Sequence, residues 1–163
     1  MPDELAAKVE AGLWYQFYFT TERGRAGLTA NRRDIARVMW PRNSPTWHFD
    51  DATFERSAAA FDNPDYVDVV IHSYRHRLGV APGFEQYAEV ESRLAAQPAI
   101  AAPAITMDGD ADGVVPATDG KSSAAKFTGP REHRVIPNVG HNLPQEDPKS
   151  FTAAVWELAS KAR

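Results

Sequence analysis

Residues 99–107, AIAAPAITM, form an apolar run that leads directly into the Asp- and Gly-rich stretch 108–113, DGDADG. A run of this length, interrupted by proline and followed by turn residues, is typical of a buried β-strand and its loop. A helix is predicted next over 118–127, then a strand over 133–136 and a last helix over 147–162. This β-α-β-α order favours two neighbouring parallel strands in an α/β sheet.

The residues before this segment are predicted to be almost entirely helical. Helical spacing of apolar residues, together with prolines and capping aspartates, predicts five helices. They are expected over residues 3–20, 31–40, 51–61, 64–78 and 84–97. Gly24 and Gly27 are expected to interrupt the helical pattern, and Pro41 to stop the second helix. Pro64 is expected at the first position of the fourth helix.

The chain therefore divides into a helical region, residues 1–97, and an α/β region, residues 98–163. Two parallel strands alone do not make a stable sheet with both faces covered. The sheet is thus expected to be completed by something outside the chain.

The composition excludes several classes of protein. The 163 residues are enough for one domain with a core, since domains typically have roughly 100–200 residues. With 18 Lys and Arg against 22 Asp and Glu, the chain lacks the charge of a general nucleic-acid binder. It contains no cysteine, which excludes disulfides, Cys-ligated zinc and a thiol nucleophile. No stretch has the apolar character of a signal peptide or a membrane span, so a cytoplasmic location is expected.

Two residues that bear catalytic chemistry follow the two predicted strands. Asp112 lies in the loop after the first strand, and His141 lies in the loop after the second. If the strands are parallel and adjacent, both loops emerge at one edge of the sheet, where catalytic groups of α/β proteins gather. A carboxylate there can accept a hydrogen bond from the imidazole and fix its tautomer. The order acid-then-histidine is the one expected when a nucleophile precedes both.

The sequences around these residues resemble those of a known superfamily. GDADGVVP over 109–116 looks like the acid loop of the α/β-hydrolases, and GHNLPQE over 140–146 looks like the histidine loop of their epoxide hydrolase and haloalkane dehalogenase branch. The resemblance covers about residues 10–158. It implies a partial α/β-hydrolase fold, in which a helical cap precedes a β-α-β-α segment with an incomplete parallel sheet. Gly140 is expected to permit an unusual backbone beside the histidine.

The helical region resembles the cap of the epoxide hydrolases, in which two tyrosines donate hydrogen bonds to the epoxide oxygen. WYQFYF over 14–19 looks like the first tyrosine segment, and Ser73-Tyr74-Arg75 looks like the second. The resemblance implies that Tyr15 and Tyr74 polarise the oxygen that becomes an alkoxide. Tyr18 is a substitute for Tyr15, and aromatics at helical spacing are also typical of a core. Trp14, Phe17 and Trp40 are candidates to line a pocket for a small hydrophobic substrate, with no cofactor and no metal.

One part of the family pattern is absent from the chain. The 163 residues contain no Gly-x-Ser-x-Gly or Gly-x-Asp-x-Gly nucleophile elbow. By resemblance, an aspartate would attack an epoxide carbon, and water activated by His141 would hydrolyse the ester, with Asp112 in support. The chain is therefore expected to be a truncated form that is inactive in isolation. Its expected partner is the missing N-terminal portion of the hydrolase, or a second copy bound through the exposed sheet edge.

Other functions remain open at this point. The same fold carries haloalkane and haloacetate dehalogenases and serine esterases, and a non-catalytic remnant could bind a partner or a hydrophobic ligand. The acid loop also fits a calcium-binding EF-hand at several positions, which are Asp108, Asp110, Asp112, Gly113 and Asp119. Pro98 and Pro103 argue against the helix that an EF-hand needs before its loop.

Two further patterns have ordinary explanations. His72 and His76 share a helix face with Asp68, as a metal-binding pair would, but a solvated helix flank explains the spacing as well. Arginines follow one another in the second predicted helix and before it, and intervening acids make a solvated surface the better account.

Overall fold

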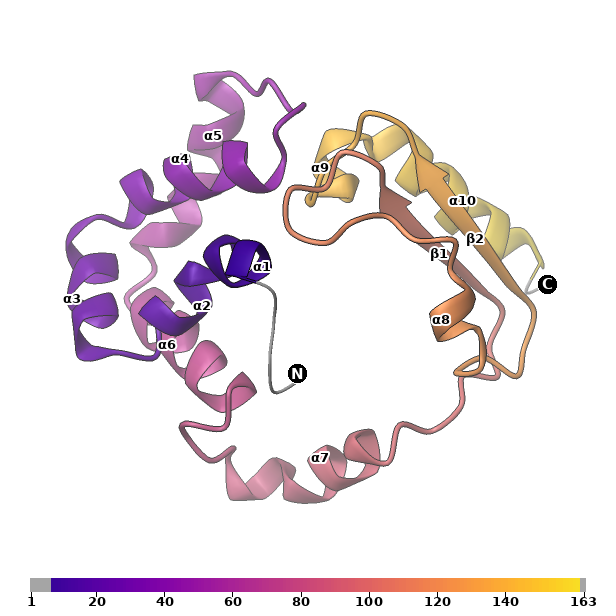
Figure 1. The fold of residues 1–163 in the computed structure, drawn as a ribbon, viewed down its shortest axis with the longest axis horizontal. Coiled ribbons are helices and arrows are strands. Elements are labelled where there is room, and N and C mark those ends of the chain that lie inside the picture. The colour runs from indigo at the N-terminus through magenta and orange to yellow at the C-terminus, as the bar shows by residue number, and fades with distance from the viewer. Residues whose placement is uncertain (1–6, 162–163) are drawn as a thin grey trace. The chain divides into compact units, whose positions relative to one another are not determined.

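The computed structural model describes residues 7–161, which form two compact units (Figure 1). The first unit comprises the described residues through Trp40 together with His48–Glu85, and the second comprises Pro41–Trp47 together with residues from Gln86 onward. The domain boundary at 97/98 stays a prediction. The part of the first predicted helix that falls on residues 3–6 lies outside the described residues.

The first unit is helical and is built around aromatic and aliphatic side chains. A buried cluster consists of Tyr15, Phe19, Leu28, Val67 and Ile71. A second cluster centres on Phe54, which has no exposed surface. The elements of this unit are α1 (Ala7–Gly12), α2 (Trp14–Tyr18), α3 (Glu22–Ala30), α4 (Arg32–Asn43), α5 (Asp51–Ala58), η1 (Ala59–Asp62) and α6 (Tyr66–Arg77). The last three residues of α4 belong to the second unit.

Helix α3 runs over the residues where the glycines were expected to interrupt helical structure. A Cβ atom on Gly24 would lie 1.8 Å from the backbone oxygen of Tyr18, and one on Gly27 would lie 1.9 Å from the Tyr18 hydroxyl. The two glycines therefore allow α3 to approach the Tyr18 region closely, and the Thr21 side chain caps the helix by accepting a hydrogen bond from Gly24 N at 2.9 Å. The expectation was wrong because close packing outweighs the roughly 1 kcal/mol helix penalty of a glycine.

Proline acts differently at two helix ends than the sequence suggested. Helix α4 continues through Pro41 to Asn43, so the proline lies in the last turn of the helix instead of ending the helix before it. Pro64 lies before α6, which begins at Tyr66, rather than at its first helical position. An aspartate cap is confirmed at α5, where the Asp50 side chain accepts a hydrogen bond from Thr53 N at 2.7 Å.

The second unit contains the predicted parallel strands. Strand β1 (Ala104–Gly109) pairs in parallel with β2 (Arg131–Ile136), in a register that runs from Ala104 opposite Arg131 to Gly109 opposite Ile136. This two-stranded parallel pair is the incomplete sheet that the sequence predicts after the helical region. The other elements are η2 (Glu85–Tyr87), which begins at the unit boundary, α7 (Ala88–Ala95), α8 (Lys121–Ala124), α9 (Leu143–Glu146) and α10 (Pro148–Lys161).

Several elements of this unit differ in length from their predictions. The apolar run begins five residues before β1, and Ile100 makes only an isolated parallel bridge to Phe127. The helix predicted over 118–127 is reduced to the single turn of α8, where Gly120 has a left-handed backbone. Helix α10 follows its prediction closely, beginning at Pro148.

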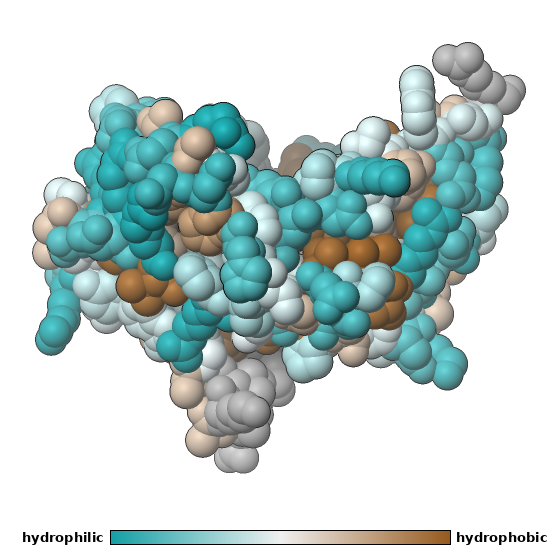
Figure 2. All heavy atoms as spheres, turned by 90° about the horizontal axis from the view of Figure 1, so that it is seen from above, coloured by the Kyte–Doolittle hydropathy of each residue, from teal (hydrophilic) through white to brown (hydrophobic). Residues whose placement is uncertain are grey.

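The second unit leaves much apolar surface exposed. Helix α10 carries Phe151, Val155 and Trp156 with 40%, 51% and 70% exposure, and α7 has no buried residue. Hydrophobic atoms are visible among hydrophilic ones in the space-filling view (Figure 2). Among the described helices, none combines the length and the hydropathy needed to cross a membrane.

Candidate active site

The loops after β1 and β2 bring Asp112 and His141 together. The two loops emerge at the same edge because the strands are parallel and adjacent. His141 Nδ1 lies 2.9 Å from Asp112 Oδ2, which is the distance of a good charge-assisted hydrogen bond. The Asp112 side chain is 13% exposed and the His141 side chain is 38% exposed, so the histidine keeps an accessible face.

The second carboxylate oxygen of Asp112 is fixed by its own loop. Oδ1 accepts hydrogen bonds from Val114 N at 2.7 Å and Val115 N at 3.0 Å. Asp112 therefore has two roles at the same time: Oδ1 caps the following turn and Oδ2 binds the histidine. A carboxylate only accepts, so the Nδ1 of His141 is the donor. In the neutral ring this leaves Nε2 unprotonated and available as a base.

A cavity of about 230 Å³ lies beside the pair. Its lining comes from the end of β1, from the acid loop and from the histidine loop: Met107, Asp108, Gly109, Asp112, Val115, Gly140, His141 and Leu143. Both members of the pair line it. The arrangement thus offers an imidazole, oriented by a carboxylate, at the wall of a cavity.

The other aspartates of the acid loop hold separate parts of the fold. Asp110 Oδ1 accepts a hydrogen bond from Asn138 N at 2.6 Å and so ties the acid loop to the loop after β2. Asp108 Oδ2 accepts from Thr118 N at 2.9 Å and from the Thr118 hydroxyl at 3.0 Å. A strand, not a helix, precedes the loop, and no group of three potential metal ligands gathers anywhere in residues 7–161. The EF-hand interpretation therefore lacks the helix that must precede its calcium-binding loop.

Every backbone N–H of the histidine loop from Gly140 to Asn142 has an acceptor. Glu146, at the end of α9, accepts from Gly140 N at 2.7 Å and from Asn142 N at 2.8 Å through its two carboxylate oxygens. Ser44 Oγ accepts from His141 N at 3.1 Å. Neither Glu146 nor Ser44 is among the site residues that the sequence predicts. Glu146 lies inside the quoted histidine motif, whereas nothing in the sequence around Ser44 indicates its contact with a loop about a hundred residues later.

Gly140 is needed for space rather than for an unusual backbone. Its φ does not fall in the left-handed region, where Gly79 and Gly120 are found. A Cβ atom on Gly140 would lie 2.6 Å from Ser44 Cα and 2.8 Å from Ser44 Cβ. The expected reason for this glycine was therefore wrong, and close packing on Ser44 replaces it.

The two tyrosines of the helical unit lie against each other. The rings of Tyr15, on α2, and Tyr74, on α6, meet edge to face with centroids 5.9 Å apart. Tyr15 is 6% exposed, and burial raises the pKa of the Tyr74 hydroxyl, with the nearby Tyr15 adding to the effect. The resemblance assigns the same function to these two residues, which lie 59 positions apart in the sequence, and the structure brings them together.

The remaining aromatic candidates occupy different surroundings. Trp14 contacts Tyr15 and Tyr18, with ring centroids 6.2 Å and 5.7 Å away, and the Tyr18 ring also lies against Phe19 at 5.6 Å. These three contacts belong to the packing of the helical unit. Phe17 is 42% exposed. Trp40 packs on Phe49 and Phe54 in the second buried cluster of this unit.

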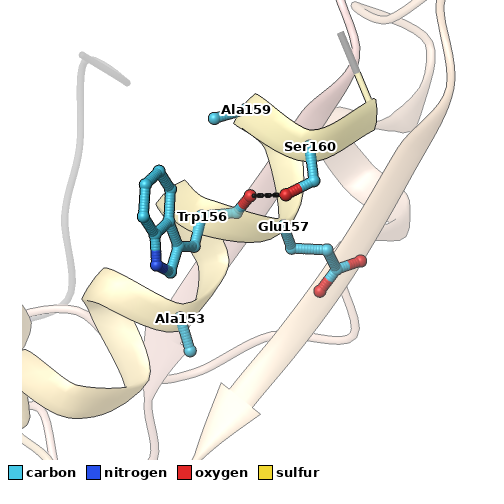
Figure 3. Close-up of a pocket in the computed structure, with 5 residues that line it drawn as sticks. All are labelled: Ala153, Trp156, Glu157, Ala159 and Ser160. Atoms are coloured by element: carbon cyan, nitrogen blue, oxygen red, sulfur yellow. Dashed lines mark hydrogen bonds between the residues drawn. The ribbon is translucent and has the colours of Figure 1, made fainter. Parts of the chain in front are cut away.

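A larger hollow, of about 570 Å³, lies along α10 (Figure 3). It is lined by Ala153, Trp156, Glu157, Ala159 and Ser160. The Trp156 indole stands out from the helix, and the Ser160 hydroxyl donates to the Trp156 carbonyl at 2.8 Å (Figure 3). This hollow holds no histidine and no nucleophile with a base beside it, so its size does not make it the better candidate.

Comparison with known proteins gives two similar solved structures. A putative epoxide hydrolase from Klebsiella pneumoniae subsp. pneumoniae is 48% identical, with a TM-score of 0.90, over 96% of this chain and 52% of that one. Cfl2 from Burkholderia cenocepacia is 15% identical, with a TM-score of 0.70, over 96% of this chain and 51% of that one, which shows the fold alone. No family model and no curated protein matches. The chain spans about half the length of both solved neighbours, and over that half it is similar in sequence and in fold to a protein described as a putative epoxide hydrolase.

Proposed function

We propose that this chain supplies the acid and the base of an epoxide hydrolase that proceeds through an aspartyl ester. The observation that carries the proposal is the hydrogen bond between His141 Nδ1 and Asp112 Oδ2, beside a cavity and at the edge of a parallel strand pair. The similarity to a protein described as an epoxide hydrolase supports the substrate class. The nucleophilic aspartate would come from a segment with the remaining strands of the sheet.

The first step forms an ester and opens the ring. The aspartate carboxylate attacks one epoxide carbon, and the bond between that carbon and the ring oxygen breaks. The oxygen takes a proton from a tyrosine hydroxyl, for which Tyr15 and Tyr74 are the candidates. Burial raises the pKa of the Tyr74 hydroxyl, which therefore carries its proton near neutral pH.

The second step releases the product. A water molecule loses a proton to Nε2 of His141 and attacks the ester carbonyl, which frees the diol and restores the aspartate. Asp112 holds the Nδ1 proton and stabilises the imidazolium that forms. The imidazolium proton then returns, through solvent, to the tyrosine oxygen.

The test uses this chain together with the half of the Klebsiella protein that it does not match. We expect no diol from styrene oxide with the chain alone, and diol when both parts are co-expressed and co-purified. H141Q is expected to stop turnover but not ester formation, so mass spectrometry should find the mass of one styrene oxide on the nucleophile-bearing part. The matched control is H48Q, since His48 belongs to the helical unit and lies outside the proposed machinery.

Other outcomes distinguish the other functions of this fold. Release of halide from haloalkanes or haloacetates without diol formation would identify a dehalogenase. Hydrolysis of p-nitrophenyl acetate with a serine ester on the nucleophile-bearing part would identify an esterase. Turnover by the chain alone, or full turnover by H141Q, would contradict the proposal.

A further inference from the structure

We propose that Ser44 is a positioning residue, which holds the backbone of His141 so that the imidazole meets Asp112. The inference rests on the proposed function, because that function is the reason His141 must be aligned with Asp112. The contacts that carry it lie entirely within the second unit, to which Pro41–Trp47 belong.

Ser44 has the burial and the contacts of a fixed acceptor. It has no exposed surface, although serine is mostly found at protein surfaces. Its Oγ lies 3.1 Å from His141 N, 3.4 Å from Asn142 N and 3.3 Å from Asn142 Nδ2, all of which donate to it. One hydroxyl thus gathers two successive backbone N–H groups and the side chain of the residue after the histidine.

The residue before Ser44 touches both catalytic loops. The carbonyl oxygen of Asn43 accepts from Gly113 N, beside Asp112, at 2.9 Å and from His141 N at 3.3 Å. Asn43, the last residue of α4, therefore contacts the acid loop and the histidine loop, and Ser44, which follows it, contacts the histidine loop. This bridge constrains the separation of the loops, on which the 2.9 Å bond between His141 and Asp112 depends.

The histidine loop packs directly against Ser44. Gly140 lies so close to Ser44 that any side chain on it would overlap the Ser44 Cα and Cβ atoms. The loop therefore rests directly on the Ser44 backbone and side chain, and the Ser44 hydroxyl accepts the shorter of the two hydrogen bonds from His141 N.

The other acceptors of the loop make the effect of Ser44 specific to His141. In S44A, Gly140 N and Asn142 N would keep the Glu146 carboxylate, at 2.7 Å and 2.8 Å in the intact chain. His141 N would keep only the longer bond to Asn43, at 3.3 Å. S44A is thus expected to loosen the histidine while the rest of the loop stays attached.

Nuclear magnetic resonance on the isolated chain tests this proposal without any turnover. Long-range ¹H–¹⁵N spectra report which imidazole nitrogen carries the proton, and amide exchange reports the His141 N–H. We expect His141 of the unaltered chain to carry its proton on Nδ1, and S44A to show a mixture of tautomers with His141 amide exchange about tenfold faster. T46A is the matched control, since the Thr46 hydroxyl donates to Asn138 O at 3.0 Å in the same segment. T46A is expected to leave the His141 tautomer unchanged.

Two outcomes would overturn the proposal. One is a folded S44A chain with the tautomer and the amide exchange of the unaltered chain, and the other is an equal change in T46A. If S44A does not fold, S44C replaces it, because a thiol has nearly the same shape and is a weaker acceptor. A folded S44C chain with unchanged His141 spectra would also overturn it. Failure of the proposed function would appear instead as an absence of turnover in the co-purified parts, with these spectra unaffected.

Discussion

At the scale of single residues, the candidate site depends on how each polar atom is used. Both oxygens of Asp112 are engaged, one by the turn that follows it and one by His141. The sequence predicts the pair because residues that follow adjacent parallel strands meet at one sheet edge. It could not predict Ser44, because a serine before a proline is typical of any turn, and its acceptor role exists only after the chain has folded.

The D112N variant separates the two uses of the Asp112 carboxylate. An amide retains an oxygen for Val114 N and Val115 N, but it places an N–H₂ group against His141 Nδ1 and so favours the tautomer that carries the proton on Nε2. In the co-purified parts, we expect diol formation to fall by roughly 10³- to 10⁴-fold, as for other acids of catalytic triads. Because the turn contacts remain, the free energy of unfolding should change by less than about 1 kcal/mol.

The control for this prediction is D119N in the same loop region. Asp119 interacts with Lys121, whose side chain is 86% exposed, and it does not line the cavity beside His141. D119N should leave diol formation unaltered. Activity of D112N equal to that of D119N would contradict a role for Asp112 in catalysis.

At the scale of elements, the sequence predicts structure correctly where local patterns determine it, and fails where contacts between distant residues determine it. The parallel pair of β1 and β2 was predicted correctly, since the apolar run, the intervening helix signal and the second strand all lie within about forty residues of sequence. The helix over Gly24 and Gly27 was missed, because the reason for those glycines is their closeness to Tyr18 in the folded unit. The last three residues of α4, Pro41–Asn43, were missed because a proline at this position predicts the end of a helix.

An ionic contact between β2 and α10 predicts a sensitivity to acid. The Glu157 carboxylate, on α10, binds Lys161 and Arg134, and these contacts lower its pKa from 4.5 to about 2. A depressed pKa contributes stability that is fully present above the unfolded value and is lost as the pH falls toward the folded value. We therefore expect the melting temperature of the chain to decrease as the pH is lowered from 4.5 to about 2. In E157Q this decrease should be smaller.

The measurement is circular dichroism during heating, repeated across this pH range. Some acid sensitivity should remain in E157Q, because Arg134 also lowers the pKa of Glu132. The matched control is E89Q on α7, since Glu89 makes no ion pair with any residue in 7–161. Identical pH profiles for E157Q and the unaltered chain would show that the contact does not contribute.

At the scale of the whole molecule, the second unit exposes apolar surface that we expect to be buried against another polypeptide. Among the described residues, β1 has one strand partner, and its other edge carries none. We propose that the remaining half of a hydrolase covers this surface in a functional protein, and that a second copy covers it when the chain is alone. Apolar surface of this kind favours association because its burial releases water.

Trp156 offers a test of association by the chain alone. It is 70% exposed on α10, so W156E adds a charge among the exposed apolar side chains of this helix. We expect the unaltered chain to self-associate in sedimentation velocity experiments and W156E to shift toward the monomer. V38E is the control, since Val38 is 59% exposed on α4 in the other unit. A strictly monomeric unaltered chain, or an equal effect of V38E, would contradict this prediction.

The assignment of residues 41–47 to the second unit has a consequence for any exchange of the helical unit between relatives. The chain passes between the units after Trp40, after Trp47 and after Glu85, so the helical unit is not one continuous insert. A chimera joined at one point near residue 97 would take Asn43 and Ser44 from the donor and the loop with Gly140 and His141 from the recipient. Such a graft would pair parts that had not been selected together, whereas one that leaves residues 41–47 in the recipient would keep the native pairing.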